Sequence, residues 1–110
     1  MADTDFGISV RRMACATVLC VRGEVDVATA PALRTAITEI LRGAPGVLVI
    51  DLSAVTFLAS AGLLALIEAT AEGGRGVRVV AAGRECVRPI RLTGLDTVLS
   101  MHGTLAEALN

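Results

Sequence analysis

The stretch from Val47 to Ala71 constrains the fold more than any other part of the chain. It is strongly apolar and long enough to cross a bilayer. However, Asp51 and Glu68 lie near its two ends, and neither lysines nor an aromatic belt flank it. Its first part, "VLVIDL" (47–52), is rich in β-branched residues, whereas "SAGLLALIEATAE" is rich in helix formers. We therefore expect a buried strand followed by a buried helix, and not a membrane span.

The rest of the chain alternates between strand and helix patterns. Strands are expected over residues 7–13, 16–23, 47–52 and 77–82, with a short last strand within 97–103. Helices are expected from the cap Thr29 to Arg42, over 60–72, over 84–95 (continuous or interrupted at Pro89), and after the cap Thr104. Residues 53–59 are expected to form a connecting loop. This order predicts an α/β fold with a mixed four- to five-stranded sheet, helices packed on it, and one domain over 1–110.

Composition and charge argue against nucleic-acid binding. The formal net charge is −1, and the ten basic residues, all arginines, are spread along the chain without a basic run. Only two aromatic residues, Phe6 and Phe57, are present, so the chain offers no aromatic platform on which bases could stack. No cluster of carboxylates, histidines or cysteines has the spacing of a metal site, and we expect neither a metal nor a cofactor.

The N-terminal residues and the cysteines favour a cytoplasmic protein. Residues 1–10 lack the basic region and apolar core of a signal peptide. The three cysteines, Cys15, Cys20 and Cys86, are odd in number and form no CxxC motif, which argues against a disulfide framework. We expect each of them to be a small buried apolar residue, and a redox role between two of them stays open.

A single hydroxyl, Ser60, lies in the apolar stretch "VTFLASAGLLAL", and three roles are conceivable for it. Catalysis is disfavoured, because Leu58 occupies the position of the first glycine in a G-x-S-x-G elbow. In addition, the one histidine, His102, is far along the chain. A helix N-cap is sufficient to explain a serine at this point. Alternatively, a hydroxyl at a helix N-terminus can carry a phosphate, which the helix dipole favours. The residues alone leave capping and phosphorylation open.

Two sequence blocks resemble a known family. The segment "GEVD" (23–26) precedes the first expected helix, and "VIDLSAVTFLASAGL" (49–63) begins 26 residues after it begins. Together with "RPIRLTGL" (88–95), they resemble the STAS domain of anti-sigma factor antagonists (anti-anti-sigma factors), particularly actinobacterial ones. The resemblance covers about Val10 to Leu109. Two positions depart from the family pattern: Ala59 replaces the aspartate before the phosphorylated serine, and Ala61 replaces the second hydroxyl.

The resemblance implies a function in partner switching, without enzymatic activity. The chain would bind an anti-sigma factor that is also a serine kinase and thereby release a sigma factor. Phosphorylation of Ser60 would weaken that binding, and a PP2C-type phosphatase would restore it. The implied contact surface comprises the turn 23–29, the loop 56–59 and the exposed N-terminal part of the second helix. The residues singled out in it are Gly23, Glu24, Asp26, Thr29, Thr56, Phe57, Leu58, Ala59, Ala61 and Gly62.

Two questions stay open after the resemblance. An alternative function is a STAS-like module that binds a small ligand or docks in a larger assembly without phosphorylation, and fold alone does not decide between the two. Asp26 is either a structural turn residue or part of the partner contact. Asp51, expected at the carboxyl end of the central strand, is best explained as a loop-capping carboxylate.

Overall fold

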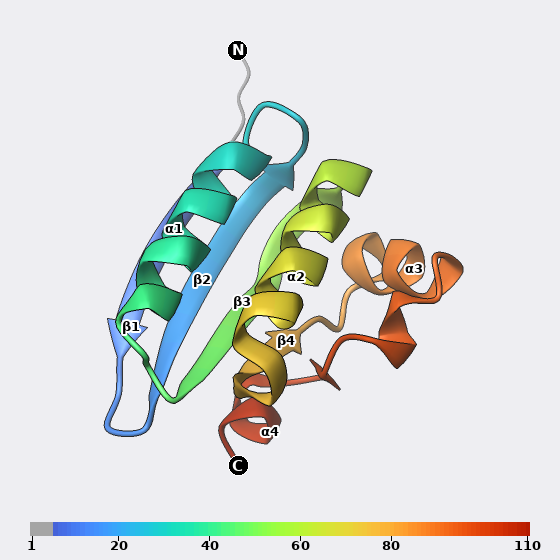
Figure 1. Ribbon diagram of the computed structural model, residues 1–110. Helices are drawn as coiled ribbons and strands as arrows, with labels where there is room; N and C mark the ends of the chain where they lie inside the picture. The colour runs from blue at the N-terminus through green and yellow to red at the C-terminus, as the bar shows by residue number, and fades with distance from the viewer. Residues whose placement is uncertain (1–5) are drawn as a thin grey trace.

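The computed structural model describes residues 6–110, which form a five-stranded sheet with four α-helices (Figure 1). The strands are β1 (Gly7–Arg12), β2 (Ala16–Val25), β3 (Val47–Leu58), β4 (Val77–Val80) and β5 (Met101–His102). The helices are α1 (Ala30–Arg42), α2 (Ser60–Gly73), α3 (Arg84–Leu92) and α4 (Leu105–Leu109), with short 3₁₀ turns at Gly74–Gly76 and Leu95–Thr97. The expected order of elements and the α/β fold are confirmed. Residues 1–5, on which the expectation of no signal peptide partly rests, lie outside the described residues.

The sheet is mixed, with the strands in chain order β1-β2-β3-β4-β5. β1 pairs with β2 in antiparallel fashion through a hairpin, and the three other pairings are parallel. Parallel neighbours need crossover helices, and α1, α2 and α3 supply them. β2 and β3 therefore lie in the middle of the sheet, and their carboxyl ends point the same way.

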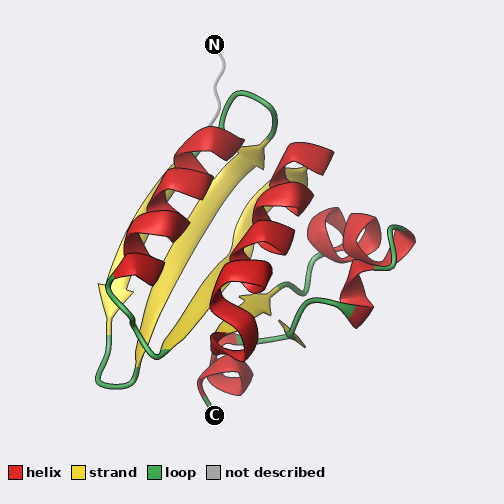
Figure 2. Ribbon diagram, viewed as in Figure 1, coloured by secondary structure: helices red, strands yellow, loops and turns green. Residues whose placement is uncertain are grey.

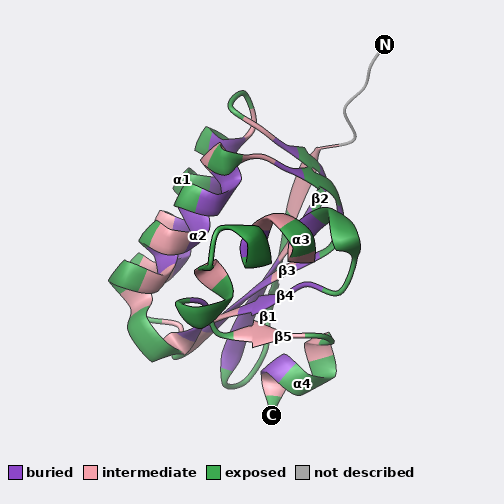
Figure 3. Ribbon diagram, turned by 90° about the vertical axis from the view of Figure 1, so that its right-hand side faces the viewer, coloured by how far each residue is buried: buried purple, intermediate pink, exposed green. Residues whose placement is uncertain are grey.

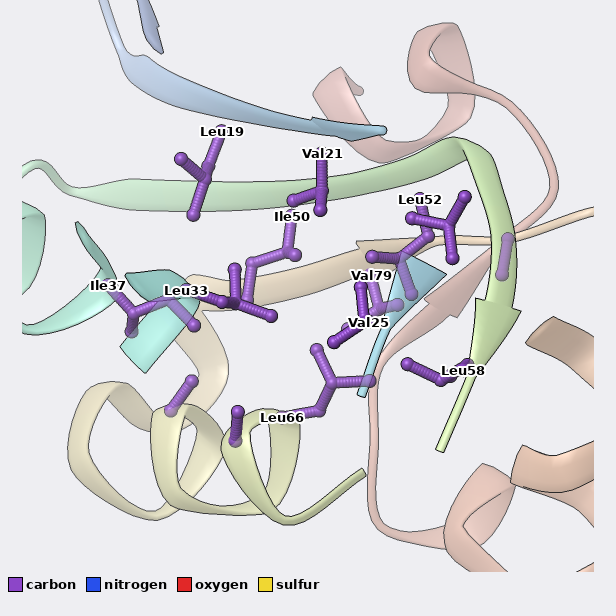
Figure 4. Close-up of a cluster of buried hydrophobic side chains, with 14 of the residues drawn as sticks. Leu19, Val21, Val25, Leu33, Ile37, Ile50, Leu52, Leu58, Leu66 and Val79 are labelled. Atoms are coloured by element: carbon purple, nitrogen blue, oxygen red, sulfur yellow. The ribbon is translucent and has the colours of Figure 1, made fainter. Parts of the chain in front are cut away.

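The helices cover the two faces of the sheet unequally. α1 and α2 lie side by side on one face (Figure 2), where the exposed ion pair Arg34–Glu68 joins them at 2.9 Å. The larger core lies beneath these two helices, and Figure 4 shows Leu33 of α1 and Leu66 of α2 among the side chains of the strands. The short α4 covers part of the opposite face through a smaller cluster around Val49.

β3 is twice as long as expected, and the prediction of a loop over 53–59 is wrong for residues 53–58. The pairing with β2 shifts register twice, between Cys20 and Arg22 and between Gly23 and Glu24, each time with one extra residue in β3. Such bulges change which side chains face inward. Leu52, Val55 and Leu58 are buried while the pairs between them are exposed. Buried residues therefore recur every three positions here. This part of the strand lacks the alternation of buried and exposed residues from which strands are predicted.

Smaller differences concern the ends of elements. β2 continues through Gly23, which adopts φ +86° at the second bulge, and ends at Val25. α3 continues through Pro89. The proline removes one N–H, but the carbonyl that loses its partner belongs to the exposed Glu85, where water can replace it.

Within residues 6–110, no helix has both the length and the apolar character to cross a membrane.

Candidate partner-binding site

The candidate site lies where the two central strands end. Val25 and Leu58 are paired as the last residues of β2 and β3, and the N–H of Ala59 donates to the carbonyl of Val25 at 2.8 Å. This bond fixes the turn after β2 beside the first turn of α2. The carboxyl ends of parallel strands are the usual place for binding sites in α/β folds. The "GEVD" block and the serine block are therefore adjacent in space.

The turn after β2 is built by its own polar side chains. The Asp26 Oδ1 atom accepts from the N–H groups of Ala28 and Thr29, at 2.9 and 3.0 Å. The Thr29 hydroxyl donates to the carbonyl of Glu24 at 2.8 Å and accepts from the N–H of Asp26 at 2.9 Å. Thr29 begins α1 as its N-cap residue, but its side chain makes no cap hydrogen bond because this turn engages it. Asp26 thus has the structural role that its position in a turn predicts.

The start of α2 differs from the expected arrangement. Ala59, in an extended conformation (φ −85°, ψ 172°), is the N-cap residue, and Ser60 is the first helical residue. No side chain caps this helix, so the prediction that Ser60 is the N-cap is wrong. The reason is that the strand continues to Leu58, which leaves only one residue between strand and helix. The Ser60 side chain is consequently exposed, at the end of the helix where backbone N–H groups lack intrahelical partners.

Gly62 allows α2 to approach the strands closely. A Cβ atom on this residue would lie 2.6 Å from Cδ1 of Leu58 and 2.7 Å from Cγ1 of Val25. Gly62, Gly23 and Leu58 are all buried. Three of the residues predicted to contact a partner therefore support the surface from beneath.

Exposed apolar side chains belong to the segments that meet at this end of the sheet. Val27 at the tip of the turn is 81% exposed, Phe57 near the end of β3 is 51% exposed, and Leu64 is 46% exposed. Leu64 follows Ser60 by four residues, so both lie on the same side of α2. We call these four residues, Val27, Phe57, Ser60 and Leu64, the Ser60 surface. Glu24 and Thr56 are also exposed near it, and Ala59 and Ala61 are partly exposed.

Val27 and Leu64 lie in segments that the sequence predicted to contact a partner, the turn 23–29 and the start of the second helix, but neither residue was singled out. An apolar residue between Asp26 and Ala28, in a turn, is a signal that could have identified Val27. Helical spacing from Ser60 could have identified Leu64.

Asp51 lies outside this surface. It is in the middle of β3, before the first bulge, and not at the carboxyl end of the strand as expected. Its Oδ1 atom accepts from the N–H and the hydroxyl of Ser53, at 2.9 and 2.6 Å. The local capping role holds, although the segment that it caps is a strand. His102 lies in β5 at the edge of the sheet, and its Nε2 atom is 3.1 Å from the hydroxyl of Ser100.

The three cysteines differ in exposure. Cys86 in α3 is buried, as predicted, and burial together with the nearby Glu85 raises the pKa of its thiol to about 11. Cys20 is partly buried. Cys15 lies in the exposed hairpin between β1 and β2, so the prediction of a buried residue is wrong there.

Known proteins with similar sequences and structures agree on the family. Residues 8–103 match the family described as "Mlab, STAS domain". The anti-sigma-F factor antagonist RsfB of Mycobacterium tuberculosis is 47% identical over 94 residues, which cover 84% of this chain and 77% of RsfB. A crystal structure of an anti-sigma factor antagonist from Mycobacterium paratuberculosis superposes with a TM-score of 0.93 at 43% identity, covering 98% of this chain and 94% of that one.

More distant structures share the fold. The Bacillus cell fate determinant SpoIIAA in its phosphorylated form has a TM-score of 0.66 at 18% identity, covering 94% of this chain and 96% of that one. Residues 8–103, which match the STAS family, contain both sequence blocks and the whole of the Ser60 surface. The chain therefore belongs to the STAS domain family, and within it to the group of the anti-sigma factor antagonists.

Proposed function

We propose that this chain acts in the cytoplasm as an anti-sigma factor antagonist whose partner is both an anti-sigma factor and a serine kinase. The unphosphorylated chain binds that partner through the Ser60 surface, which frees the sigma factor. The partner then phosphorylates Ser60, and the phosphorylated chain dissociates. A PP2C-type phosphatase removes the phosphate and restores binding.

The observation that carries this proposal is the exposed Ser60 hydroxyl at the first position of α2. The Ser60 side chain makes no hydrogen bond with residues 6–110. By contrast, the side chains of Asp26 and Thr29 in the adjoining turn form hydrogen bonds that stabilise the turn. The small neighbours Ala59 and Ala61 leave room for a kinase active site. An accessible hydroxyl that the fold does not use is available for modification.

The chemistry of the modification fits this position. The Ser60 oxygen would attack the γ-phosphorus of ATP held by the kinase, forming a serine O–P bond, losing the hydroxyl proton and releasing ADP. A phosphate at the first residue of a helix lies near unpaired N–H groups and the positive end of the helix dipole. The helix therefore tolerates the phosphate. SpoIIAA, which has this fold, is known in a phosphorylated form, so the fold itself is compatible with phosphorylation.

The same phosphate would weaken docking. Val27, Phe57 and Leu64 are exposed apolar residues of the segments that adjoin Ser60, and a partner that covers these segments must also cover what is attached to Ser60. A phosphate adds about −2 charge, whose desolvation in an apolar interface is unfavourable. The names of the relatives, RsfB among them, support an anti-sigma factor as that partner.

The experiment that tests the proposal maps the phosphate. The chain is incubated with the anti-sigma factor kinases of its source organism and ATP, and the product is analysed by mass spectrometry. We expect one phosphate, on Ser60. The matched controls are Ser60→Ala, which should stay unmodified, and Ser9→Ala, which removes another exposed serine and should be modified normally.

Two results would contradict the proposal. Phosphate on Thr56 or another residue would place the switch elsewhere. If no anti-sigma factor binds the chain, the alternative of a STAS module that binds a small ligand or docks in a larger assembly would be favoured.

A further inference from the structure

An open groove lies along α3, and no residue that lines it belongs to the Ser60 surface. The groove has a volume of about 580 Å³. Ala81 and Ala82, which follow β4, line part of it. Arg84, Arg88 and Arg91 of α3 also line it, and all three are exposed. Figure 3 shows α3 on the outside of the molecule, with much of its surface exposed. We call this feature the arginine groove.

The three arginines form a row. Their spacing of four and three residues places them on one side of the helix, over about 10 Å of its length. The helix also contains Glu85, but Glu85 does not line the groove and its side chain lies against Gly83. Within residues 6–110, the recorded ion pair is Arg34–Glu68, so none of the three guanidinium groups has a carboxylate partner there.

The stability of α3 does not explain this row. Arg84 is the first helical residue, next to the positive end of the helix dipole, where a carboxylate would be favourable and a cation is unfavourable. Arg84 with Arg88, and Arg88 with Arg91, are like-charged pairs at helical spacing, which destabilise a helix. Only Arg91, in the last turn, complements the dipole. A row of cations that the helix does not need indicates a role toward another molecule.

The groove also has apolar walls. Val87 lies between the arginines and is partly buried, and Leu92 at the end of the helix is 73% exposed. Guanidinium groups bind carboxylates in bidentate geometry, and the apolar parts can receive an aliphatic anchor. Carboxylates at i, i+4 and i+7 of a partner helix lie about 6 and 5 Å apart along its axis, as the arginines do.

We propose that the arginine groove docks an acidic helical segment of a partner protein, with carboxylates on the three arginines and an aliphatic side chain against Leu92. The contact is separate from the Ser60 surface and does not depend on the function proposed above. Charge complementarity identifies the partner: the row is cationic on a chain whose formal net charge is −1. An electrostatic contact of this kind contributes specificity and association rate more than affinity.

The test uses a defined probe. A fluorescein-labelled helical peptide, with glutamates at i, i+4 and i+7 and leucines beside them, is titrated with the chain in a fluorescence anisotropy assay. Its counterpart with glutamines is the peptide control. We expect the triple variant Arg84→Gln, Arg88→Gln, Arg91→Gln to bind the glutamate peptide about tenfold more weakly than the wild type.

A matched protein control separates the groove from net charge. The triple variant Arg12→Gln, Arg42→Gln, Arg75→Gln removes three other exposed arginines, so both variants have the same net charge. It should bind the glutamate peptide within about twofold of the wild type. Ser60→Ala should also bind it normally, which distinguishes this contact from the proposed switch. Circular dichroism verifies that each variant is folded.

Several outcomes would overturn the proposal. Equal weakening in both triple variants would show attraction to net charge alone. Equal binding of the glutamine peptide would exclude a role of the carboxylates. Binding of ATP, inorganic phosphate or phosphatidylglycerol vesicles at the three arginines, without binding of the peptide, would identify a different kind of anionic ligand.

Discussion

The N-termini of α2 and α4 differ in whether side chains bind the backbone N–H groups that lack intrahelical partners. At α4, the Thr104 hydroxyl accepts from the N–H of Glu107 at 3.1 Å, and the Glu107 carboxylate accepts from the N–H of Gly103 at 3.0 Å. Glu107 has the position of the glutamate in a capping box, but its carboxylate binds the N–H of the residue before the N-cap and not that of the N-cap itself. At α2, the N-cap is Ala59, which has no polar side chain, and the Ser60 hydroxyl beside it is exposed.

The difference shows where the chain uses polar groups for folding and where it leaves them free. α4 is a short helix whose start is held by these two side-chain hydrogen bonds. α2 has an extensive apolar contact with the sheet, including the fully buried Leu66, so it does not need a cap. A hydroxyl that contributes little to stability can be modified or buried by a partner without unfolding its helix.

The largest effect should come from filling the close contact at the start of α2. Gly62→Val would place new atoms against Val25 and Leu58, and we expect a loss of about 3 kcal/mol in the free energy of unfolding. Gly103→Val, just before α4, is the matched control. A Cβ there would meet its nearest neighbour, Oε1 of Glu107, at 3.6 Å, and we expect a loss below about 1 kcal/mol. Urea denaturation measures both, and equal losses would contradict this contrast.

The two hydroxyls should differ in their contribution to stability. Thr104→Ala removes a cap hydrogen bond and should lower the free energy of unfolding by about 1 kcal/mol. Ser60→Ala removes a side chain that caps nothing and should change it by less than about 0.5 kcal/mol. Thermal and urea unfolding of the two variants would decide. A loss at Ser60 as large as that at Thr104 would mean that the serine has a structural role.

Adding a cap to α2 should make the two helix starts alike. Ala59 already has the extended conformation of an N-cap residue, so Ala59→Asp needs no change of the backbone. We expect it to raise the free energy of unfolding by about 1 kcal/mol. Ala59→Asn, which caps without a charge, is the control and should give a similar gain. If neither variant is more stable, the first turn of α2 already has partners for its N–H groups.

Near the start of α3, unlike at α2 and α4, the polar side chain, the Cys86 thiol, is buried. The pKa of the Cys86 thiol is raised to about 11, mainly by burial. Between pH 9 and 11 the unfolded chain loses this proton and the folded chain keeps it. The free energy of unfolding should therefore fall as the pH rises through this range. The chain contains neither lysine nor tyrosine, so few other groups titrate there.

Two cysteine variants check this smallest effect. Cys86→Val should flatten the pH dependence of unfolding above pH 9, whereas Cys15→Ser, which changes an exposed thiol, should retain it. The reverse pattern would show that the titrating thiol lies in the hairpin. The same proteins should differ toward a thiol reagent, since exposed Cys15 reacts before buried Cys86.

The sequence predicted most of the fold because its strands and helices carry regular patterns. The helix beginning at Ser60 and the strand beginning at Val47 were both correct in type. The second half of β3 was missed because its two bulges produce a burial period of three, which matches neither a strand nor a helix. Because the strand is longer than predicted, Ser60 is the first helical residue instead of the N-cap, and Asp51 lies within the strand instead of at its end.

The candidate site was only partly predictable. The sequence blocks indicated the turn and the serine, but which of their residues are exposed depends on tertiary packing. Leu58 and Gly62, which were singled out as contact residues, are buried beneath the surface, while Val27 and Leu64, which were not singled out, are exposed on it. The arginine groove had no signal at all in a search for basic runs, because its three arginines are separated in sequence and meet only on one side of α3.

In the function proposed above, the hydroxyl left free at the start of α2 controls partner binding. The most direct measurement is the affinity of the anti-sigma factor for the unmodified chain and for the chain phosphorylated at Ser60, by isothermal titration calorimetry. We expect phosphorylation to weaken binding at least tenfold, and Ser60→Ala to bind like the unmodified chain. Equal affinity of the phosphorylated and unmodified chains would contradict it.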